Sequence, residues 1–328
     1  MTSGVIFMAT ADSGGVSMWS TTSGVTVSST QKRTGVNSLR IAGSASYAHR
    51  AVPAASEYYA RYGIFVTQNL DDDFKLRLRE GTTVHVSVLL QPNSGYFQAF
   101  MGTETGTSLG TGGVAAIGNW YCVEVYAKIA NSPDGEVRVK INGTEVITAT
   151  GVDTRNGATG VIDNIYFQSD TQYMYIDDVI VRDDAWPGTG GIYVMTMVED
   201  GSDTGWTASE TDRHECVDEV PPTFTNYISA DAGTPGTKST FTVSGLTGNF
   251  LSIDNVRVAA LAQLDLAGLG QVKTIGLSDG EYSKGSPVAL DVSPLWVYHD
   301  ILLDPGLTPD GAWQKAAVNA LEVGVETV

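Results

Sequence analysis

The chain has 328 residues and carries 37 acidic side chains against 19 lysines and arginines, which gives a formal net charge of −18. A chain this acidic would repel a phosphate backbone and an anionic lipid surface, so its composition argues against nucleic-acid binding and membrane attachment. Its length is sufficient for two separately buried cores.

No stretch approaches the apolar length of a membrane helix, and residues 1–12 lack the basic and apolar regions of a secretory signal. We therefore expect no membrane insertion, synthesis in the cytoplasm, and release by a route other than ordinary secretion. Cys122 and Cys216 lie in different halves of the chain, and we expect both thiols to be reduced and chemically idle.

Short alternating runs separated by Gly, Ser and Thr fill the first part of the chain. Residues 74–79 alternate Phe, Leu and Leu with Lys, Arg and Arg, which is the pattern of a strand with one buried face. Residues 84–88 alternate again after the Glu80-Gly81 turn. Residues 102–119 are rich in Gly and Thr, so we expect a long loop there with at most one weak strand.

The clearest strand pattern lies between residues 120 and 150. Residues 120–129 alternate apolar and polar side chains, with Cys122 and Tyr126 on the outer face, and residues 137–141 alternate in the same way. Asn142-Gly143 then suits a two-residue type I′ turn, because both residues tolerate positive φ. The sequence therefore predicts a three-stranded antiparallel meander.

Strand patterns continue at residues 162–167 and 175–181, and the Pro and clustered Gly of 187–191 mark a domain boundary. One later segment, 312–323, has the pattern of a helix, with Gly324 where a C′ residue is common. Its apolar face comprises Trp313, Ala316, Ala317, Ala320 and Leu321.

We therefore predict an all-β protein of two β-sandwich, jelly-roll-like domains in series with one short C-terminal helix. The first domain spans 1–186, the linker 187–191, and the second domain, also rich in strands, 192–328.

Four motifs in the first domain follow the order seen in a known superfamily. They are T-G-V-N-S-L-R-I at 34–41, W-Y-C-V-E-V-Y-A-K-I at 120–129, V-R-V-K-I-N-G-T-E-V at 137–146 and Y-I-D-D-V-I-V at 175–181. From about Lys32 to Arg182 the chain thus resembles the laminin-G-like, concanavalin A-like jelly rolls. That resemblance implies binding of glycans or protein partners, and some members are glycosidases.

The second half resembles a domain of tailed-bacteriophage virion proteins. The resemblance is carried by W-T-A-S-E-T-D-R-H-E-C-V-D-E-V-P-P at 206–222, S-I-D-N-V-R-V-A-A-L-A at 252–262 and A-W-Q-K-A-A-V-N-A-L-E-V-G-V-E at 312–326. It implies a component of the virion surface and no catalytic site. Release by host lysis agrees with the missing secretory signal.

Residues 210–215 read E-T-D-R-H-E, which is similar to the bulged-strand motif of one family of retaining β-glucanases. There, two Glu residues about 5 Å apart act as nucleophile and acid/base. Glu210 and Glu215 would take these roles here. The residues between the acids are polar, whereas that family has apolar ones, so a solvated acidic loop is the preferred interpretation.

Two groups of carboxylates are candidate Ca²⁺ ligands, because Ca²⁺ takes oxygen ligands from loops. They are the run Asp71, Asp72 and Asp73 and the pair Asp177 and Asp178. The alternative is a charged turn for the first group and the start of a strand for the second.

Aromatic side chains are candidate stacking partners for sugar rings, and the residues chosen as ligand-binding are Trp120, Tyr126, Tyr173 and Tyr175. Ordinary sheet packing or a partner interface is the competing interpretation.

The combined interpretation is a non-enzymatic structural component of a tailed-phage virion, exposed on the particle as capsid decoration or as part of the tail or fibre. Its expected partners are other virion proteins, further copies of itself in a homo-oligomer, and a host-surface glycan as candidate ligand. No cofactor is expected apart from the candidate Ca²⁺. A free carbohydrate-binding module or adhesin is the first alternative, and a glycoside hydrolase using residues 210–215 is the second.

Overall fold

The structure is a computed structural model that describes residues 4–328 apart from 68–73, 92–93, 158, 171–172, 211, 220–221, 223–224, 232, 249–251, 266–269 and 302–312. The chain divides into two compact units, Gly4–Ile192 and Tyr193–Val328. No helix in the described part of the chain is long and apolar enough to cross a membrane.

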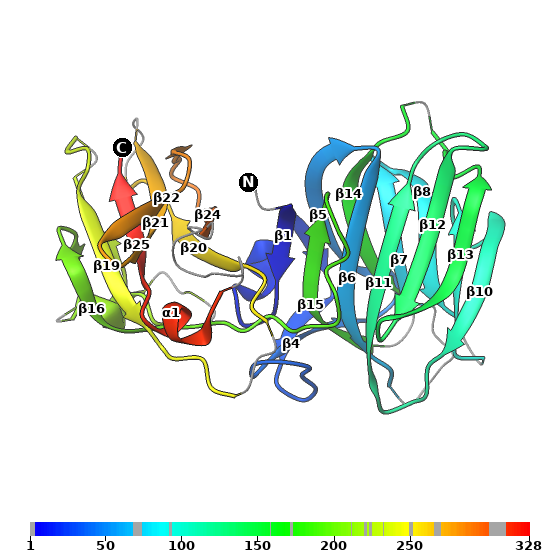
Figure 1. Ribbon diagram of the computed structural model, residues 1–328, viewed down its shortest axis with the longest axis horizontal. Helices are drawn as coiled ribbons and strands as arrows, with labels where there is room; N and C mark the ends of the chain where they lie inside the picture. The colour runs from blue at the N-terminus through cyan, green and yellow to red at the C-terminus, as the bar shows by residue number, and fades with distance from the viewer. Residues whose placement is uncertain are drawn as a thin grey trace. The chain divides into compact units, whose positions relative to one another are not determined.

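The first unit consists of two antiparallel sheets that form two layers (Figure 1). Sheet A has the strand order β13 (Thr144–Val152), β12 (Gly135–Ile141), β11 (Trp120–Lys128), β6 (Glu57–Phe65), β15 (Tyr173–Arg182), β4 (Ser38–Ala42) and β3 (Val25–Ser28), with β1 (Val5–Ala9) beside β15. Sheet B has the order β10 (Thr107–Val114), β9 (Tyr96–Met101), β8 (Thr83–Leu90), β7 (Phe74–Glu80), β14 (Ile162–Ser169), β5 (Ser46–Ala55) and β2 (Thr21–Ser23). A 3₁₀ turn, η1 (Gly15–Met18), lies between β1 and β2 in sequence.

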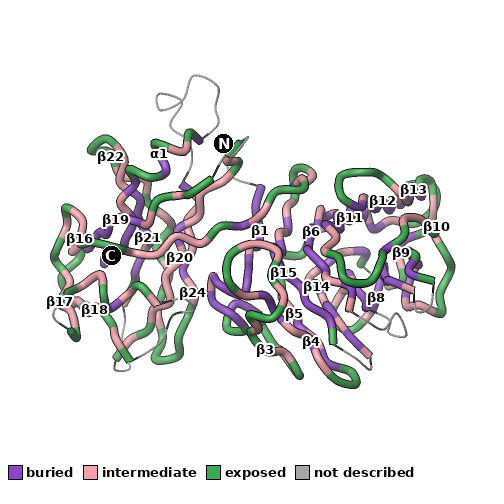
Figure 2. The backbone as a smooth tube through the Cα atoms, turned by 90° about the horizontal axis from the view of Figure 1, so that it is seen from below, coloured by how far each residue is buried: buried purple, intermediate pink, exposed green. Residues whose placement is uncertain are grey.

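The core of the first unit lies between the two sheets. Tyr62 of sheet A contacts two aromatic rings of sheet B, with centroid distances of 5.8 Å to Phe74 and 5.1 Å to Phe167. The alternate residues of β7, including Leu76 and Leu78, are fully buried, as the sequence pattern predicts. Figure 2 shows the buried residues gathered in the paired strands and the exposed ones in the connecting loops.

The predicted meander is confirmed as β11, β12 and β13. Val123 pairs with Ile141 and Ala127 with Val137, so the buried faces of the first two strands are in register. Asn142 and Gly143 have φ of 50° and 81°, which is the left-handed conformation that a type I′ turn requires.

The second unit contains one six-stranded sheet, in the order β16 (Met197–Thr204), β19 (Lys238–Val243), β25 (Glu322–Thr327), β21 (Gln271–Ser278) and β22 (Glu281–Lys284), with β23 (Val288–Ala289) beside β21. Two short ladders accompany it: β17 (Thr207–Ala208) with β18 (Ile228–Ser229), and β20 (Val256–Ala262) with β24 (Leu295–Ile301). A 3₁₀ turn, η2 (His214–Cys216), and the helix α1 (Lys315–Asn319) complete it. The predicted fold class, all-β sandwiches with one short helix near the C-terminus, is confirmed.

The C-terminal helix is much shorter than the predicted segment 312–323. The helix α1 covers Lys315–Asn319, and Val318 packs with Trp313 and Leu321 in the core of the second unit. Residues 322–327 form β25, which lies between β19 and β21 in the middle of the sheet. Gly324 is therefore a strand residue, and the prediction that it ends the helix is wrong.

The region 102–119, predicted to be a long loop with at most one weak strand, contains one strand, because Thr107–Val114 forms the edge strand β10 of sheet B. A Cβ at Gly112 would lie 2.1 Å from the carbonyl oxygen of Val146, so this strand needs glycine to approach β13 closely. The Gly-rich composition that suggested a loop is thus a packing requirement.

Candidate functional site

The four aromatic residues predicted to bind a ligand all lie on sheet A, but they fall into two groups. Trp120 and Tyr175 both contact Phe65, at centroid distances of 5.5 Å and 6.2 Å, and Tyr173 contacts Tyr175 at 5.9 Å. Arg40 lies 4.3 Å over the Tyr173 ring. Tyr173 is 40% exposed and Trp120 and Phe65 are half-buried, whereas Tyr175 is buried, so this aromatic row is open to solvent only in part.

Tyr126 belongs to a separate cluster that is closed by the chain itself. Its ring stacks on Tyr59 at 4.6 Å, and Trp186 contacts both rings, at 5.3 Å to Tyr59 and 6.2 Å to Tyr126. Lys140 lies 3.9 Å over the Trp186 ring, and the Tyr126 hydroxyl donates a hydrogen bond to Glu57 at 2.6 Å. These contacts leave Tyr126 only 9% exposed, which gives it little surface for a ligand.

Trp186 begins a segment, residues 186–192, that crosses the outer face of sheet A, and we call this segment the strap. Gly188 donates its N–H to Glu124 at 2.7 Å, and its carbonyl oxygen accepts a hydrogen bond from Arg61 at 3.3 Å. Cys122 is 3% exposed although it lies on the face predicted to point outward, and Arg33, Arg61 and Glu124, which bond to the strap, lie near its thiol. The linker predicted at 187–191 is thus bound to the first unit over its whole length.

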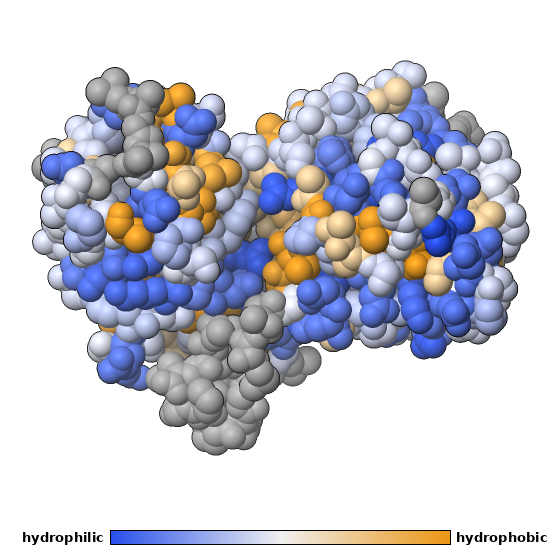
Figure 3. All heavy atoms as spheres, turned by 90° about the horizontal axis from the view of Figure 1, so that it is seen from above, coloured by the Kyte–Doolittle hydropathy of each residue, from blue (hydrophilic) through white to orange (hydrophobic). Residues whose placement is uncertain are grey.

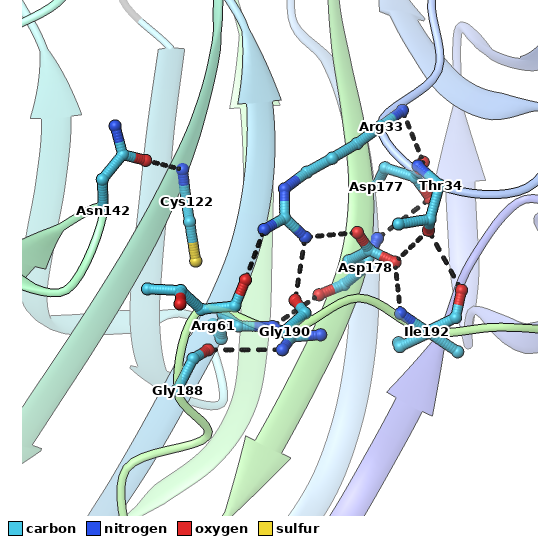
Figure 4. A network of polar contacts seen from close by, with 11 residues as sticks. Arg33, Thr34, Arg61, Cys122, Asn142, Asp177, Asp178, Gly188, Gly190 and Ile192 are labelled. Atoms are coloured by element: carbon cyan, nitrogen blue, oxygen red, sulfur yellow. Dashed lines mark hydrogen bonds and ion pairs between the residues drawn. The ribbon is translucent and has the colours of Figure 1, made fainter. Parts of the chain in front are cut away.

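The candidate Ca²⁺ ligands Asp177 and Asp178 are buried, and their carboxylates bond to other segments of the chain (Figure 4). Asp178 forms an ion pair with Arg33, accepts a hydrogen bond from the Thr34 hydroxyl at 2.6 Å, and accepts another from the Ile192 N–H at 2.8 Å. Asp177 accepts backbone N–H groups of Arg33 and Thr34 at 3.1 Å and 3.3 Å. Both carboxylates therefore fasten chain segments to β15.

No cluster of three or more His, Cys, Asp or Glu side chains suited to a metal ion is present among the residues that the structure describes. Asp71, Asp72 and Asp73 lie outside those residues. Glu210 and Glu215 are both exposed, and Glu215 lies in the 3₁₀ turn η2, so the two acids do not share one strand.

A different group of charged, polar and aromatic side chains lies on the outer face of sheet B, where β7, β14 and β5 run side by side. Register places Arg77 opposite Tyr166, and Tyr166 opposite His49. Lys75 is opposite Gln168, and Gln168 is opposite Tyr47. The outer face of these three strands thus presents cationic, amide and aromatic side chains, and we call it the β7–β14–β5 face. Its members are Lys75, Arg77, Arg79, Tyr166, Gln168, Tyr47 and His49.

At one end of the β7–β14–β5 face, cations and carboxylates form a hydrogen-bonded network. Arg77 donates to the Gln168 side-chain oxygen at 2.7 Å and to Glu104 at 2.9 Å. Lys75 is ion-paired with Glu104 at 2.9 Å and also with Asp170. Burial on its own would raise the pKa of Glu104, but the hydrogen bonds from Lys75 and Arg77 lower that pKa to about 2. This network fixes the direction of the Arg77 guanidinium and of the Gln168 amide.

At the other end, an arginine and two tyrosines are stacked. The Tyr47 and Tyr166 rings lie 5.0 Å apart with an interplanar angle of 20°, and the Arg79 guanidinium lies 4.5 Å over the Tyr166 ring. The Arg79 Nε has no hydrogen-bond partner in the part of the chain that the structure describes. His49 lies 6.3 Å from Tyr166, and burial together with Arg79 lowers its pKa. The histidine is therefore neutral at physiological pH.

The buried His85 lies on β8 of the same sheet, next to β7. Its Nδ1 accepts the backbone N–H of Asn156 at 3.0 Å, so the ring proton sits on Nε2, which donates to Glu80 at 3.1 Å. Since His85 is fully buried and both ring nitrogens are bonded, it supports the loop that carries Asn156.

No known family model matches the chain, and no curated protein matches its sequence. Solved structures are similar to it at low identity. An endo-β-1,4-glucuronan lyase from the fungus Trichoderma reesei is 12% identical and covers 52% of this chain and 93% of its own, with a TM-score of 0.41. The alginate lyase Aly36B is 19% identical, with coverage of 57% and 99% and a TM-score of 0.40.

A third similar structure is the conserved carbohydrate esterase of the Shiga toxin-encoding bacteriophage phi24B. It is 15% identical and covers 56% of this chain and 99% of its own, with a TM-score of 0.41. These likenesses, at 12–19% identity and TM-scores of 0.40–0.41, assign the chain to no specific family.

Proposed function

We propose that the first unit binds an anionic, carboxylate-bearing glycan on the β7–β14–β5 face. The observation that carries the proposal is the stack of Arg79 on Tyr166 and of Tyr166 on Tyr47, next to the fixed Arg77–Gln168 pair. An aromatic ring presents an apolar surface to the face of a sugar ring. A guanidinium presents a planar fork of N–H donors that fits a carboxylate.

Charge supports an acidic ligand over a neutral one. The chain has a formal net charge of −18, yet three of its 19 lysines and arginines alternate along one face of β7. Lys75 and Arg77 are paired with Glu104, whereas the Arg79 guanidinium lies over the Tyr166 ring and forms no ion pair within the residues that the structure describes. Arg79 is therefore the cation with donor capacity left for a carboxylate.

The test is affinity electrophoresis and isothermal titration calorimetry with polyuronates, and with a neutral β-glucan for comparison. The parent protein should bind a polyuronate more tightly than the β-glucan, and binding should weaken as salt is added. Arg79→Ala should lower the affinity at least about tenfold, since a hydrogen bond to a charged group contributes about 1.5–3 kcal/mol. The matched control is Arg138→Ala, which removes a cation of β12 that is paired with Glu136.

Two results would contradict the proposal: equal affinity of the parent for polyuronate and β-glucan, or equal loss in both arginine variants. Incubation with polyuronate, followed by an assay of new reducing ends and of ultraviolet absorbance from unsaturated uronate, checks the prediction that the protein is not an enzyme. Chain cleavage that disappears in Arg79→Ala would make this face a catalytic site.

We also propose, on the sequence resemblance alone, that the protein is carried on the surface of a tailed-phage particle. Immunogold labelling of purified particles tests this location independently of glycan binding. Label over the heads indicates capsid decoration, and label on the tail indicates an adhesive role. Unlabelled particles would contradict the virion location and favour a free glycan-binding module.

A further inference from the structure

The strap is held to sheet A along its whole length, and its far end depends on one charged cluster. Arg33 donates to the carbonyl oxygens of Thr189 at 2.7 Å and Gly190 at 3.0 Å, and it is ion-paired with Asp178. Ile192 donates its N–H to Asp178, and its carbonyl oxygen accepts the Thr34 hydroxyl at 3.0 Å. The end of the strap is therefore fastened through an ion pair between the partly buried Arg33 and the buried Asp178 (Figure 4).

The charges in this cluster balance only when one carboxyl is protonated. Asp178, Glu124, Arg33 and Arg61 lie close enough to interact electrostatically around Cys122, and Asp177 adds a third carboxyl beside Asp178. The two guanidiniums offset two carboxylates. When the third carboxyl ionises as well, one uncompensated negative charge remains in a buried site, which is costly.

Asp177 is the carboxyl whose ionisation leaves this uncompensated negative charge. It is 1% exposed and lies next to Asp178 in the chain. Burial and the negative charge of Asp178 raise the pKa of Asp177 to about 7, although backbone N–H groups of Arg33, Thr34 and Asp178 lower it in part. The thiol of Cys122 also faces the cluster, and burial raises its pKa, so it adds no charge near neutrality.

We propose that the strap is a proton-controlled closure of sheet A, which is tightest when Asp177 is protonated and which loosens when Asp177 becomes a carboxylate. The direction follows from the two states. In the open state, Asp177 is hydrated and has an ordinary pKa of about 3.9, whereas in the closed state it binds its proton more strongly. The closed strap is thus most stable below about pH 4 and loses stability up to about pH 7, above which the loss is complete.

Cys122 reports directly on this opening. It pairs with Gly63 on the neighbouring strand, and a Cβ placed on Gly63 would lie 2.6 Å from the Arg33 Cδ, so the Arg33 side chain lies over this point. Arg33 is in turn held by the strap. A reagent can therefore reach the Cys122 thiol only when Arg33 and the strap move away.

The experiment measures the protection of Cys122 against 4,4′-dithiodipyridine, a reagent that reacts in mild acid. The background variant is Cys216→Ser, because the two cysteines are the only thiols in the chain. Protection is the labelling rate of the denatured protein divided by that of the native protein at the same pH, so the reactivity of the thiol itself cancels. We expect protection to fall at least tenfold between pH 5 and pH 7.

Asp177→Asn removes the titrating group and should keep protection high and constant over this range. Glu124→Gln is a second, independent test. It removes another carboxylate, so the positive charges of Arg33 and Arg61 then balance the negative charges of Asp178 and ionised Asp177. It should therefore weaken the pH dependence. Glu136→Gln is the matched control, since it removes a carboxylate of the same sheet that is paired with Arg138, and it should follow the parent.

Constant protection of the parent from pH 5 to pH 7 would overturn the proposal. So would an unchanged pH dependence in Glu124→Gln, even if Asp177→Asn does not fold. This test uses no glycan, so its outcome is independent of whether the β7–β14–β5 face binds one.

Discussion

Tyr47 and Tyr166 stack at 5.0 Å across two neighbouring strands, although they are far apart in the sequence. Tyr166 is the centre of the β7–β14–β5 face because it contacts Tyr47 on one side and Arg79 on the other. Burial raises its pKa, so the phenol keeps its proton at neutral pH. The ring therefore acts as a neutral, apolar surface.

Tyr166→Ala should weaken polyuronate binding by about tenfold, because an aromatic contact contributes about 0.5–1.5 kcal/mol and Arg79 also loses its support. Tyr166→Phe keeps the ring and should bind nearly as well as the parent. Calorimetric titration of both variants measures the difference. Tyr227→Ala, which removes a tyrosine that is 55% exposed in the second unit, is the control. Equal losses of affinity in Tyr166→Phe and Tyr166→Ala would show that the hydroxyl, and not the ring, is required.

Acid should destabilise the first unit through Glu104. Its pKa is lowered to about 2 in the folded protein from an ordinary value of 4.5, because Lys75 and Arg77 donate hydrogen bonds to it. This stabilisation is present above about pH 4.5 and is lost as the pH falls toward 2. Urea unfolding between pH 2 and pH 6 should show it.

Glu104→Gln should show less acid destabilisation than the parent over the same interval, and it should be less stable at pH 6, where buried Lys75 loses one of its partners. Glu145→Gln, which replaces an exposed carboxylate on β13, should follow the parent. If Glu104→Gln matches the parent at every pH, the network contributes nothing to stability.

Gly324→Ala should destabilise the second unit strongly. A Cβ at Gly324 would lie 1.9 Å from the carbonyl oxygen of Ser239 on the neighbouring strand, so two backbones would have to separate in the middle of the sheet. We expect a loss of about 2 kcal/mol or more in thermal or urea unfolding. Gly245→Ala is the control, because the nearest atom to its Cβ would be the Asn319 side chain at 3.4 Å. Equal stability of the two variants would contradict this account of β25.

Trp186→Ala should loosen the other end of the strap independently of pH. The variant loses two ring contacts and the Lys140 contact, and a loss of about 0.5–1.5 kcal/mol corresponds to labelling of Cys122 that is about two- to tenfold faster. The increase should be the same at pH 5 and pH 7, which separates this anchor from Asp177. Trp296→Ala, in the second unit, should leave the labelling rate unchanged.

The strands of the first unit could be predicted from sequence because apolar and polar residues alternate in a strand that has one buried face. The meander of residues 120–150 was predictable for this reason and because Asn142-Gly143 specifies the turn. The helix prediction extended too far, to residue 323, because the helical apolar spacing that ends at Leu321 was continued past Asn319, where the helix ends. Val323 and Val325 lie two residues apart, which is the spacing of a strand, and Glu322–Thr327 pairs with two strands in the folded chain.

The candidate site could not be predicted because alternation does not say which strands are neighbours. Arg79 and Tyr166 meet only because β14 lies next to β7, which is a property of the sheet order. The signal that was present in the sequence is the run Lys75, Arg77, Arg79 in an otherwise acidic chain. On sheet A, the sequence correctly predicted which side chains of β11 lie on its outer face. It did not predict that the strap, residues 186–192, covers this face.

The strap also has a mechanical consequence. The chain leaves the first unit at Ile192, so a pull on the chain beyond that residue first loads the hydrogen bonds of Ile192 to Asp178 and Thr34, and only afterwards those of Gly190, Thr189 and Gly188. Bonds loaded one after another yield at low force. Peeling the seven residues would add about 20 Å of slack before any strand of sheet A bears tension. In a protein anchored at one end and holding a surface at the other, such a segment would absorb a sudden load.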